Sequence, residues 1–570
     1  MKKLLKFIKG YKKESVLGPL FKLLEAALEL IVPLVIAALI DKGIGSSDHG
    51  YIVRSCLILV ALGAIGLAFS VTAQYFAAKA SCGFSAAMRS SLFSHIGTLS
   101  YTELDTIGSS TLITRITADS NQVQTGINLT LRLLLRSPFV VFGAMIMAFT
   151  VDVQSAITFA VVIPVLSIVV FGIMLITMPL YKKVSRGVDS ILSKTRENLD
   201  GARVIRAFCK EDEEISEFRE RNDALTAMQK FVGKISSLMN PLTYIIINLA
   251  IIALIYSGAI RVELGELTQG EVVALYNYMS QILVELIKLA NLIITITKSA
   301  AAANRISAVF ETESSMKYGD EKFTGLKDGI SFNDVSLCYK NAAETSLSDI
   351  SFEAKRGETI GVIGGTGSGK TSLINLIPRF YDATKGEITV DGKPISSFDK
   401  ESIRSRIGVV PQKAALFEGS IRENMLWGKA DATDEEINRA LAIAQADKVV
   451  MDKGGLDAHI EEGGRNLSGG QRQRLTIARA LVRNPDILIL DDSASALDYA
   501  TDAALRSAIA ESTKESLVFI VSQRASSVMH ADKIIVLDDG KAIGIGTHGE
   551  LLAACPLYKE IYDTQFGEVV

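Results

Sequence analysis

A glycine-rich segment in the second half of the chain carries the residues best suited to chemistry. Gly364–Thr371 reads GGTGSGKT and follows a strand-like run that ends at Val362–Ile363. Glycines let backbone N–H groups turn toward an anion without Cβ clashes, and the helix expected next points its N-terminus at the same place. Lys370 can reach the β- and γ-phosphates of a nucleoside triphosphate, and Thr371 can bind Mg²⁺. The expected nucleotide contacts are Gly364, Gly365, Thr366, Gly367, Ser368, Gly369, Lys370 and Thr371.

Two later segments are aliphatic runs that end in polar side chains. Ile487–Asp491 reads ILILD, and its last residue is the carboxylate expected beside Mg²⁺, with Asp492 next in the chain. Phe519–Arg524 reads FIVSQR and carries Gln523 near its end. A third segment, LSGGQ at Leu467–Gln471, lies between the glycine-rich loop and ILILD. The order of these motifs along the chain is what makes the set specific.

The composition separates a membrane part from a soluble part. The chain has 570 residues, which predicts two or more domains. It is 48% hydrophobic with a mean hydropathy of +0.29, and the excess lies before residue 300. A net charge of −3 gives no global argument for nucleic-acid binding. The five cysteines have no zinc spacing and no C-x-x-C pair, which predicts scattered thiols.

Six runs are long and apolar enough to cross a bilayer, which takes about 20 residues. They are residues 16–40, 52–79, 133–151, 154–180, 237–260 and 271–297. The connections Ser81–Arg132 and Tyr181–Ser236 are long. Six spans that start inside place both in the cytoplasm, and the lysines and arginines after Tyr181 agree with that side. Each is expected to form two helices that project roughly 40 Å from the membrane. Their turns are predicted at Leu104–Ser110 and Cys209–Ile215, where we expect contact with the soluble domain.

The N-terminal segment MKKLLKFIKGYKK carries six lysines before the first apolar run. A cleaved signal peptide is the competing interpretation, but the run that follows exceeds the usual apolar core of about 7–15 residues and contains charges. We therefore expect a retained first span with its lysines in the cytoplasm. Six spans then place both termini in the cytoplasm.

Charged residues inside the predicted spans have two interpretations. Lys22, Glu25 and Glu29 are spaced to share one helix face, and Glu285 with Lys288 repeats that spacing in the last span. Such groups either line a water-filled cavity that receives substrate, or pair with one another near the interface. Asn240 and Asn248 are further candidates for a mixed cavity together with Glu29.

The rest of the chain predicts a soluble α/β domain. Glu311–Gly325 is polar and typical of a linker, and strand-like runs alternate with helical stretches after it. We expect a transmembrane domain at residues 1–310, a linker at 311–328 and a nucleotide-binding domain at 329–570. The fold class is therefore an all-α six-helix transmembrane domain with long cytoplasmic helical extensions, followed by an α/β P-loop domain with a helical subdomain.

Residues 330–560 resemble the nucleotide-binding domain of ATP-binding cassette (ABC) transporters. Leu467–Gln471 matches the signature motif of that family, Gln412 in VVPQ its Q-loop, and Ser495–Asp498 (SALD) its D-loop. The resemblance implies that Tyr339 stacks on adenine and that Thr371, Gln412 and Asp491 surround Mg²⁺. It also implies that Glu461–Asn466 touches a membrane domain. The nucleotide contacts that it adds are Tyr339, Gln412, Leu467, Ser468, Gly469, Gly470, Gln471 and Asp498.

Together with the six spans, the whole chain resembles an exporter-type half-transporter. In this resemblance Asp105–Ser120 and Leu199–Glu213 are the two coupling-helix regions. One set of six spans and one cassette imply a dimer, in which two cassettes sandwich two ATP molecules head to tail. Each site then takes its phosphate loop from one chain and LSGGQ from the other.

The chain departs from the family pattern at its two candidate catalytic residues. Asp492 stands where the family usually has Glu, and Gln523 stands where it usually has His. Asp reaches less far than Glu by one methylene, and Gln neither carries charge nor titrates. This resembles the degenerate-site subunit of heterodimeric multidrug-type exporters, which would work in the plasma membrane with a non-identical partner and an amphipathic substrate. A homodimeric exporter with modest ATPase and a regulatory membrane subunit that binds ATP are the alternatives.

Overall fold

The computed structural model describes residues 2–340, 342–493 and 497–566. The chain divides into two compact units, which are described separately. The helical unit comprises Met1–Gly97 and Ser110–Thr312. The α/β unit comprises Thr98–Ser109 and Glu313–Val570, so a short segment between two long helices belongs to the soluble part.

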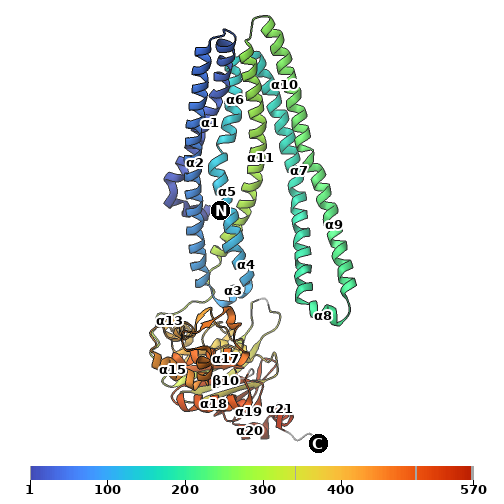
Figure 1. Cartoon of the computed structure of the whole chain (residues 1–570). Coiled ribbons are helices and arrows are strands. Elements are labelled where there is room, and N and C mark those ends of the chain that lie inside the picture. Colours follow the sequence, from blue (N-terminus) through green and yellow to red (C-terminus); the bar gives the residue numbers. More distant parts are fainter. Residues whose placement is uncertain (1, 341, 494–496, 567–570) are drawn as a thin grey trace. The chain divides into compact units, whose positions relative to one another are not determined.

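The helical unit consists mainly of long helices (Figure 1). Its elements are the 3-10 helix η1 (Lys2–Tyr11), α1 (Lys12–Ala38), the π-helix η2 (Leu39–Ile44), α2 (His49–Thr98), α4 (Ser109–Thr114), the π-helix η3 (Arg115–Asp119), α5 (Ser120–Leu133), α6 (Arg136–Val151), α7 (Val153–Asp200), α8 (Ala202–Ala207), α9 (Glu211–Ser237), α10 (Met239–Glu263) and α11 (Gln269–Glu311).

Six helical stretches in the described residues are long and apolar enough to cross a membrane. They are Lys6–Ile44, His49–Thr98, Ser109–Val151, Val153–Asp200, Glu211–Glu263 and Gln269–Glu311. Each contains one of the predicted runs, so the six-span prediction is confirmed. The 50 residues of α2 extend about 75 Å at 1.5 Å per residue, far more than a bilayer core needs. The long connections are therefore continuations of the spans.

Both predicted turns lie where the helices reverse. In the first connection α3 (Tyr101–Ile107) ends at Gly108, whose φ of +81° favours glycine. In the second, α8 is followed by Cys209 with φ +52°, and α9 begins at Glu211. Four acidic residues in the first turn of α9 complement the positive end of its helix dipole.

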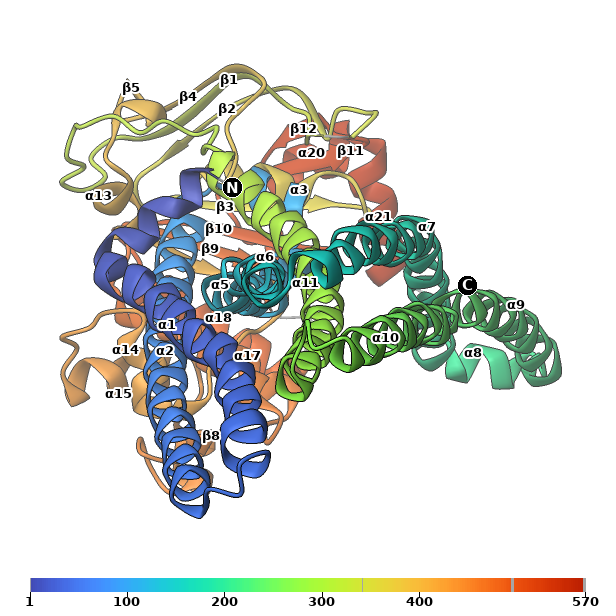
Figure 2. The same cartoon turned by 90° about the horizontal axis from the view of Figure 1, so that it is seen from above.

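The interior of the helical unit is built mainly from α1, α6, α7, α10 and α11. Small side chains such as Ala26, Ala144 and Ala274 are fully buried there and let the helices approach closely. The Tyr278 hydroxyl donates to the Leu30 carbonyl oxygen at 2.7 Å and ties α11 to α1. In both views α9 lies along α7, away from α1 and α2 (Figures 1 and 2).

The α/β unit is built on a six-stranded sheet of order β12-β11-β3-β10-β9-β6, in which only β12 is antiparallel. A four-stranded antiparallel sheet, β2-β1-β4-β5, and the two-stranded sheet β7-β8 complete the unit. The strands are β1 (Gly329–Leu337), β2 (Leu347–Lys355), β3 (Thr359–Gly364), β4 (Lys385–Val390), β5 (Lys393–Pro394), β6 (Ile407–Val410), β7 (Gly419–Ser420), β8 (His459–Ile460), β9 (Ile487–Asp491), β10 (Leu517–Ser522), β11 (Lys533–Asp538) and β12 (Lys541–Gly546).

Helices cover these sheets and form a helical subdomain, as predicted. They are α3, α12 (Lys370–Leu376), η4 (Ile395–Ser397), α13 (Lys400–Arg404), α14 (Ile421–Leu426), α15 (Asp434–Ile443), α16 (Asp447–Lys453), η5 (Glu462–Gly464), α17 (Gly469–Val482), α18 (Tyr499–Ser512), α19 (Ala525–Val528), α20 (His548–Ala554) and α21 (Pro556–Phe566).

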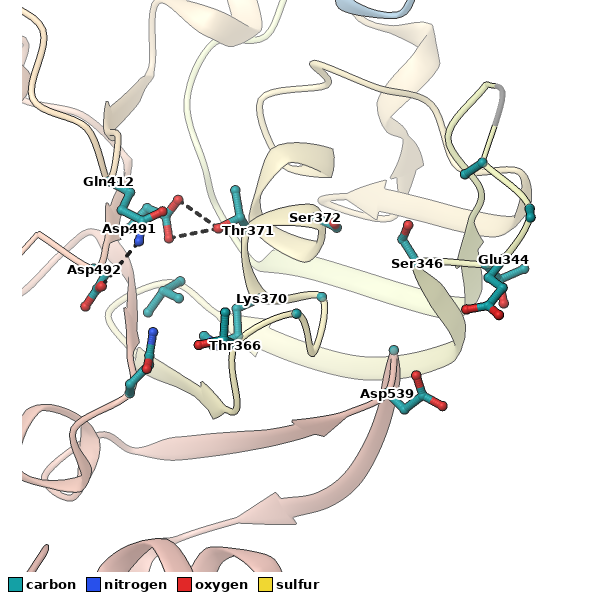
Figure 3. A pocket seen from close by; sticks show the side chains of 18 residues that line it. Glu344, Ser346, Thr366, Lys370, Thr371, Ser372, Gln412, Asp491, Asp492 and Asp539 are labelled. Atoms are coloured by element: carbon teal, nitrogen blue, oxygen red, sulfur yellow. Dashed lines mark hydrogen bonds between the residues drawn. The ribbon is translucent and has the colours of Figure 1, made fainter. Parts of the chain in front are cut away.

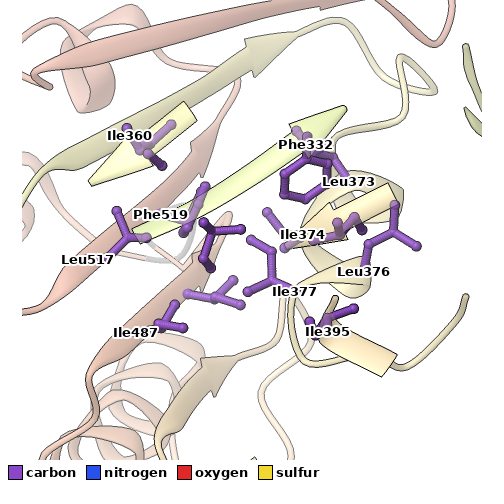
Figure 4. Close-up of a cluster of buried hydrophobic side chains, with 14 of the residues drawn as sticks. Phe332, Ile360, Leu373, Ile374, Leu376, Ile377, Ile395, Ile487, Leu517 and Phe519 are labelled. Carbon is purple, nitrogen blue, oxygen red and sulfur yellow. The ribbon is translucent and has the colours of Figure 1, made fainter. Parts of the chain in front are cut away.

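The main core of the α/β unit fixes the helix that follows the glycine-rich loop. Leu373 and Ile377 of this segment are fully buried in one apolar cluster with Phe519 of β10 and Phe332 of β1 (Figure 4). A second cluster joins α14, α15, α16 and α17 to the other side of the sheet. The loop before α12 is therefore held between a rigid strand and a buried helix.

Candidate functional site

A pocket of about 570 Å³ opens where β3, β9 and β10 end (Figure 3). These strands are parallel neighbours, with Val521 paired to both Val362 and Asp491. The carboxyl ends of all three therefore meet at one edge of the sheet, which is where α/β sheets bind ligands. Gly367, Gly369, Lys370, Thr371, Gln412, Asp491, Asp492 and Gln523 are among the residues that line the pocket.

The glycine-rich loop has the backbone shape of an anion cradle. Gly367 and Gly369 have φ values of +86° and +96°, which L side chains rarely adopt. A Cβ atom on Gly369 would also lie 2.8 Å from the Ser346 carbonyl oxygen. The Lys370 ammonium donates to the carbonyl oxygens of Gly364 at 2.9 Å and Gly365 at 2.5 Å, and burial lowers its pKa. Its positive charge is thus held inside the loop.

Thr371 and Asp491 form the part of the pocket suited to a metal ion. The Thr371 hydroxyl lies 3.1 Å from Oδ2 of Asp491, and the two groups converge from α12 and β9 (Figure 3). Burial raises the pKa of Asp491, and the neighbouring Asp492 charge adds to this effect. A buried carboxylate beside a hydroxyl and a second carboxylate is a hard-oxygen set that Mg²⁺ fits. The predicted third member, Gln412, also lines the pocket.

The two candidate catalytic residues both face this pocket. The Gln412 amide donates to Oδ2 of Asp492 at 3.5 Å. Asp492 has a φ of +44°, a backbone region that Asp enters more readily than most residues, and its N–H donates to the Val521 carbonyl oxygen at 3.0 Å. Gln523 lines the pocket from the segment after β10. The structure therefore brings Asp492 and Gln523 together with the loop.

Other predicted contacts do not line this pocket. Tyr339 packs edge-to-face against Tyr381 at 4.9 Å between ring centroids and donates to the Ser372 hydroxyl at 3.1 Å. Ser468 caps α17 by accepting from the Gln471 N–H, and the Gln471 side chain accepts from the Ser468 N–H. The pocket lining contains none of the signature residues Leu467, Ser468, Gly469, Gly470 and Gln471.

The predicted D-loop is described only in part. Ser495 and residue 496 of the predicted Ser495–Asp498 motif lie outside the described residues. Asp498 accepts from the Thr501 N–H at 2.9 Å and caps α18, and it does not line the pocket.

Sequence reasoning missed Gln565, which forms hydrogen bonds with the segment that carries Gln523. The Gln565 amide donates to the Gln523 carbonyl oxygen at 2.9 Å, and its oxygen accepts from the Ala525 N–H at 2.8 Å. Gln565 lies on α21, which is anchored by the fully buried Tyr558. No sequence pattern identifies this contact, because it joins backbone groups to a side chain about 40 residues away.

Tyr381 is a second residue that the motifs did not reveal. Its hydroxyl donates to Oδ2 of Asp105 in α3 at 2.5 Å, and Tyr101 packs on Phe380 with ring centroids 4.7 Å apart. Burial and the Asp105 hydrogen bond raise the pKa of Tyr381, so its hydroxyl stays a donor. The predicted contact of the first turn with the soluble domain is thus observed within the α/β unit. For the second turn, at Cys209–Ile215, the contact stays a prediction.

Comparison with known proteins shows the family to which the chain belongs. The family model for the ABC transporter transmembrane region matches residues 15–286, and the family model described as ABC transporter matches residues 347–495. The ABC transporter ATP-binding protein YfiB of Bacillus subtilis is 36% identical over 100% of this chain and 99% of its own length. The chain belongs to the ABC transporter family, with a transmembrane region fused to a nucleotide-binding cassette.

Two further comparisons bear on the branch of the family. An ATP-dependent lipid A-core flippase of Vibrio vulnificus is 28% identical over 100% of this chain and 98% of its own length. The structure of a bacterial Atm1-family ABC exporter with ATP bound has a TM-score of 0.82 at 22% identity, covering 99% of this chain and 100% of that one. The fold is therefore that of an ABC exporter.

The Gln565 contact yields a first prediction. Gln565→Ala should lower the single-turnover rate of ATP hydrolysis by the full chain about three- to tenfold, because Gln523 loses its backbone support. ATP affinity should change little, since Gln565 does not line the pocket. The measurement is quench-flow hydrolysis alongside ATP titration. Thr564→Ala is the control, because the Thr564 hydroxyl donates to the Glu560 carbonyl oxygen of its own helix. Equal losses in both variants would contradict this role.

The Tyr381 contact yields a second prediction. Tyr381→Phe keeps the ring but removes the hydrogen bond to Asp105, so amide hydrogen exchange in Thr98–Ser109 should accelerate about tenfold. Tyr318→Phe removes a hydroxyl that pairs with Arg404 instead, and should leave that segment unchanged. Hydrogen-exchange mass spectrometry separates the two outcomes. The same exchange rate in both variants would show that Asp105 does not hold the segment.

Proposed function

We propose that this chain is one half of a heterodimeric ABC exporter that uses ATP to drive efflux across the plasma membrane. The observation that carries the proposal is the pocket itself, which combines an intact phosphate loop with an Asp and a Gln at the hydrolytic positions. The chain would comprise a transmembrane domain at 1–310, a linker at 311–328 and a cassette at 329–570, with both termini cytoplasmic. Membrane-associated substrates of the relatives, such as lipid A-core, favour an amphipathic cargo.

ATP would bind with its phosphates in the glycine-rich loop. The loop N–H groups and the Lys370 ammonium would hold the β- and γ-phosphate oxygens, and Tyr339 would stack on adenine. Mg²⁺, held near Thr371, Gln412 and Asp491, would neutralise charge on the phosphates. Tyr339 does not line the pocket in this structure, but its neighbour Ser372 does.

Hydrolysis at this chain's own loop would be slow. A water that attacks the γ-phosphate needs a base within about 2.6–3.2 Å, and a misplacement of about 1 Å can cost roughly 100-fold. The Asp492 carboxylate is one methylene shorter than the Glu of the family pattern, and a Gln412 donor lies 3.5 Å from it. Gln523 can orient water or phosphate by hydrogen bonds, but it brings no positive charge.

A second cassette would complete both ATP sites. None of Leu467–Gln471 lines this chain's pocket, and Ser468 caps α17, so the motif would present the N-terminus of α17 to a second cassette. Helix N-termini attract phosphate, which suits a nucleotide held by the partner's loop. This chain would thus hold ATP at a slow site and contribute its signature motif to a competent one.

Movement would pass from the cassette to the spans through the short helices of the two connections. Closure of the cassettes on ATP would displace the segment around α3, which Tyr381 and Phe380 hold. Because α2 ends just before this segment and α4 begins just after it, its displacement would reorient the spans. The substrate cavity between the spans would then open outward. Val204 and Phe208 at the second turn are exposed apolar side chains that suit docking on the partner's cassette.

Two alternatives to the heterodimeric exporter can be tested by experiment. A homodimeric exporter with modest turnover would place Asp492 at both sites. A regulatory membrane subunit would bind ATP without a cycle, but an intact LSGGQ has no use in such a subunit. Co-purification of tagged with untagged copies tests the first alternative, and vesicle transport with the partner present tests the second.

The central prediction concerns Asp492 and Gln523. The purified chain should hydrolyse ATP weakly, and Asp492→Glu with Gln523→His should raise the steady-state rate at least about tenfold by restoring reach and a titratable group. Asp539→Glu is a matched control, since Asp539 also lines the pocket and has a φ of +43°, close to the +44° of Asp492. Robust turnover by the unmodified chain that depends on Asp492 would contradict the slow-site proposal.

A further inference from the structure

A groove of about 290 Å³ with both polar and apolar walls lies between α1, α6 and α11 in the helical unit. Glu29 lines it from α1, and Asn277, Ser280, Gln281, Glu285 and Lys288 line it from α11. Apolar side chains such as Val32, Val140 and Val284 form the rest of its walls. Asn240 and Asn248, expected in a mixed cavity with Glu29, lie on α10 and do not line this groove.

The polar residues of α11 form one stripe along the helix. Asn277, Gln281, Glu285 and Lys288 are separated by four, four and three residues, which places them on one face. All four belong to a stretch apolar enough to cross a membrane. Ionisable groups at such depth are costly and usually mark a pathway for a polar ligand.

Arg136 of α6 forms hydrogen bonds with both acidic residues of the groove, Glu29 and Glu285, but does not itself line the groove. Its guanidinium donates to Oε1 of Glu285 at 2.5 Å and to Oε2 of Glu29 at 2.6 Å, and its side chain is only 7% exposed. The Ser137 hydroxyl donates to the other Glu285 oxygen at 2.9 Å. The acidic residues are thus anchored to α6 and held in place.

Two opposite charges nevertheless remain accessible in the groove. The Glu29 side chain is 42% exposed, and the Lys288 side chain is 44% exposed. Lys288 pairs with Oε1 of Glu285 at 2.8 Å, so its ammonium keeps further donors. The Gln281 side-chain oxygen is buried and has no hydrogen-bond partner among the described residues. An accessible carboxylate, an accessible ammonium and an unsatisfied acceptor therefore share one groove.

The charges of the cluster decide which ligand it suits. Arg136 and Lys288 balance Glu29 and Glu285, so the cluster is neutral. A ligand with net charge would bring an uncompensated charge into an apolar region, which is expensive. A ligand with one positive and one negative group adds none, and each of its charges meets an opposite one.

We propose that this groove binds the polar headgroup of a zwitterionic amphiphile, with its ammonium at Glu29 and its acidic group at Lys288. The apolar walls suit the hydrocarbon part next to the headgroup. This inference rests on the proposed export function, since it names the class of cargo.

The test uses three probes that share a dodecyl chain. They are dodecylphosphoethanolamine, which is zwitterionic, dodecylamine, which is cationic, and methyl dodecyl phosphate, which is anionic. Binding of each radiolabelled probe to the full chain in lipid nanodiscs is measured without ATP, with empty nanodiscs as background. The unmodified chain should bind the zwitterion about tenfold more tightly than either charged probe.

Two substitutions should shift this preference in opposite directions. Glu29→Gln should weaken zwitterion binding about tenfold and favour the anionic probe over dodecylamine, whereas Lys288→Gln should weaken it similarly and favour dodecylamine. Glu14→Gln is the matched control, because it removes one carboxylate from the same helix, where Glu14 pairs with Lys79 and does not line the groove. A misfolded variant loses all three probes together and cannot produce opposite shifts.

Equal binding of the three probes, or equal losses for all probes in both variants, would overturn the proposal and leave the cluster as a brace between helices. Because binding is measured without ATP, a failure of the export proposal leaves this result interpretable. ATP hydrolysis measured separately on the same nanodiscs tests the pocket alone.

Discussion

The parallel pairing of β9, β10 and β3 is the constraint on which the candidate ATP site depends. It aligns Asp491 with Val521 and Ile363 with Ser522, so the residues that follow each strand emerge at one edge. The glycine-rich loop therefore shares a pocket with Asp492 and Gln523, although both lie more than 100 residues after it in the chain. Fully buried aliphatic side chains on all three strands pack into the apolar clusters on both faces of this sheet.

The two units compensate their buried charges in different ways. In the α/β unit, Lys370 and Asp491 lie in a pocket shaped for a highly charged ligand, and burial moves both pKa values toward the neutral forms. Phosphates and a divalent ion would reverse that penalty. In the helical unit, Arg136 compensates Glu285 and Glu29 without any ligand, so the cluster persists at membrane depth. The pocket of the α/β unit therefore suits a highly charged ligand, whereas the groove of the helical unit suits a ligand with no net charge.

Local patterns predicted much of the fold. The number of spans, the helical continuations beyond the membrane and both turns follow from apolar run length, sparse breakers and turn residues. The phosphate loop and the strand that ends at Asp491 were equally predictable, because each motif consists of a few consecutive residues. The pairs Lys22–Glu25 and Lys288–Glu285 were predictable too, since residues three apart meet on a helix. The packing of the Tyr339 ring on Tyr381 was not predictable, because position in the chain does not indicate that neighbour.

The sequence by itself determined which groups are available: an intact phosphate loop, an intact LSGGQ, and an Asp and a Gln at the hydrolytic positions. Only the tertiary structure decided which of them meet. It brought Asp492 and Gln523 to the loop, kept LSGGQ out of the same pocket, and joined Arg136 to Glu29 and Glu285 across 107 and 149 residues. The physical reason is range: helical periodicity and turn chemistry act between near neighbours, whereas these contacts depend on how whole helices and strands pack.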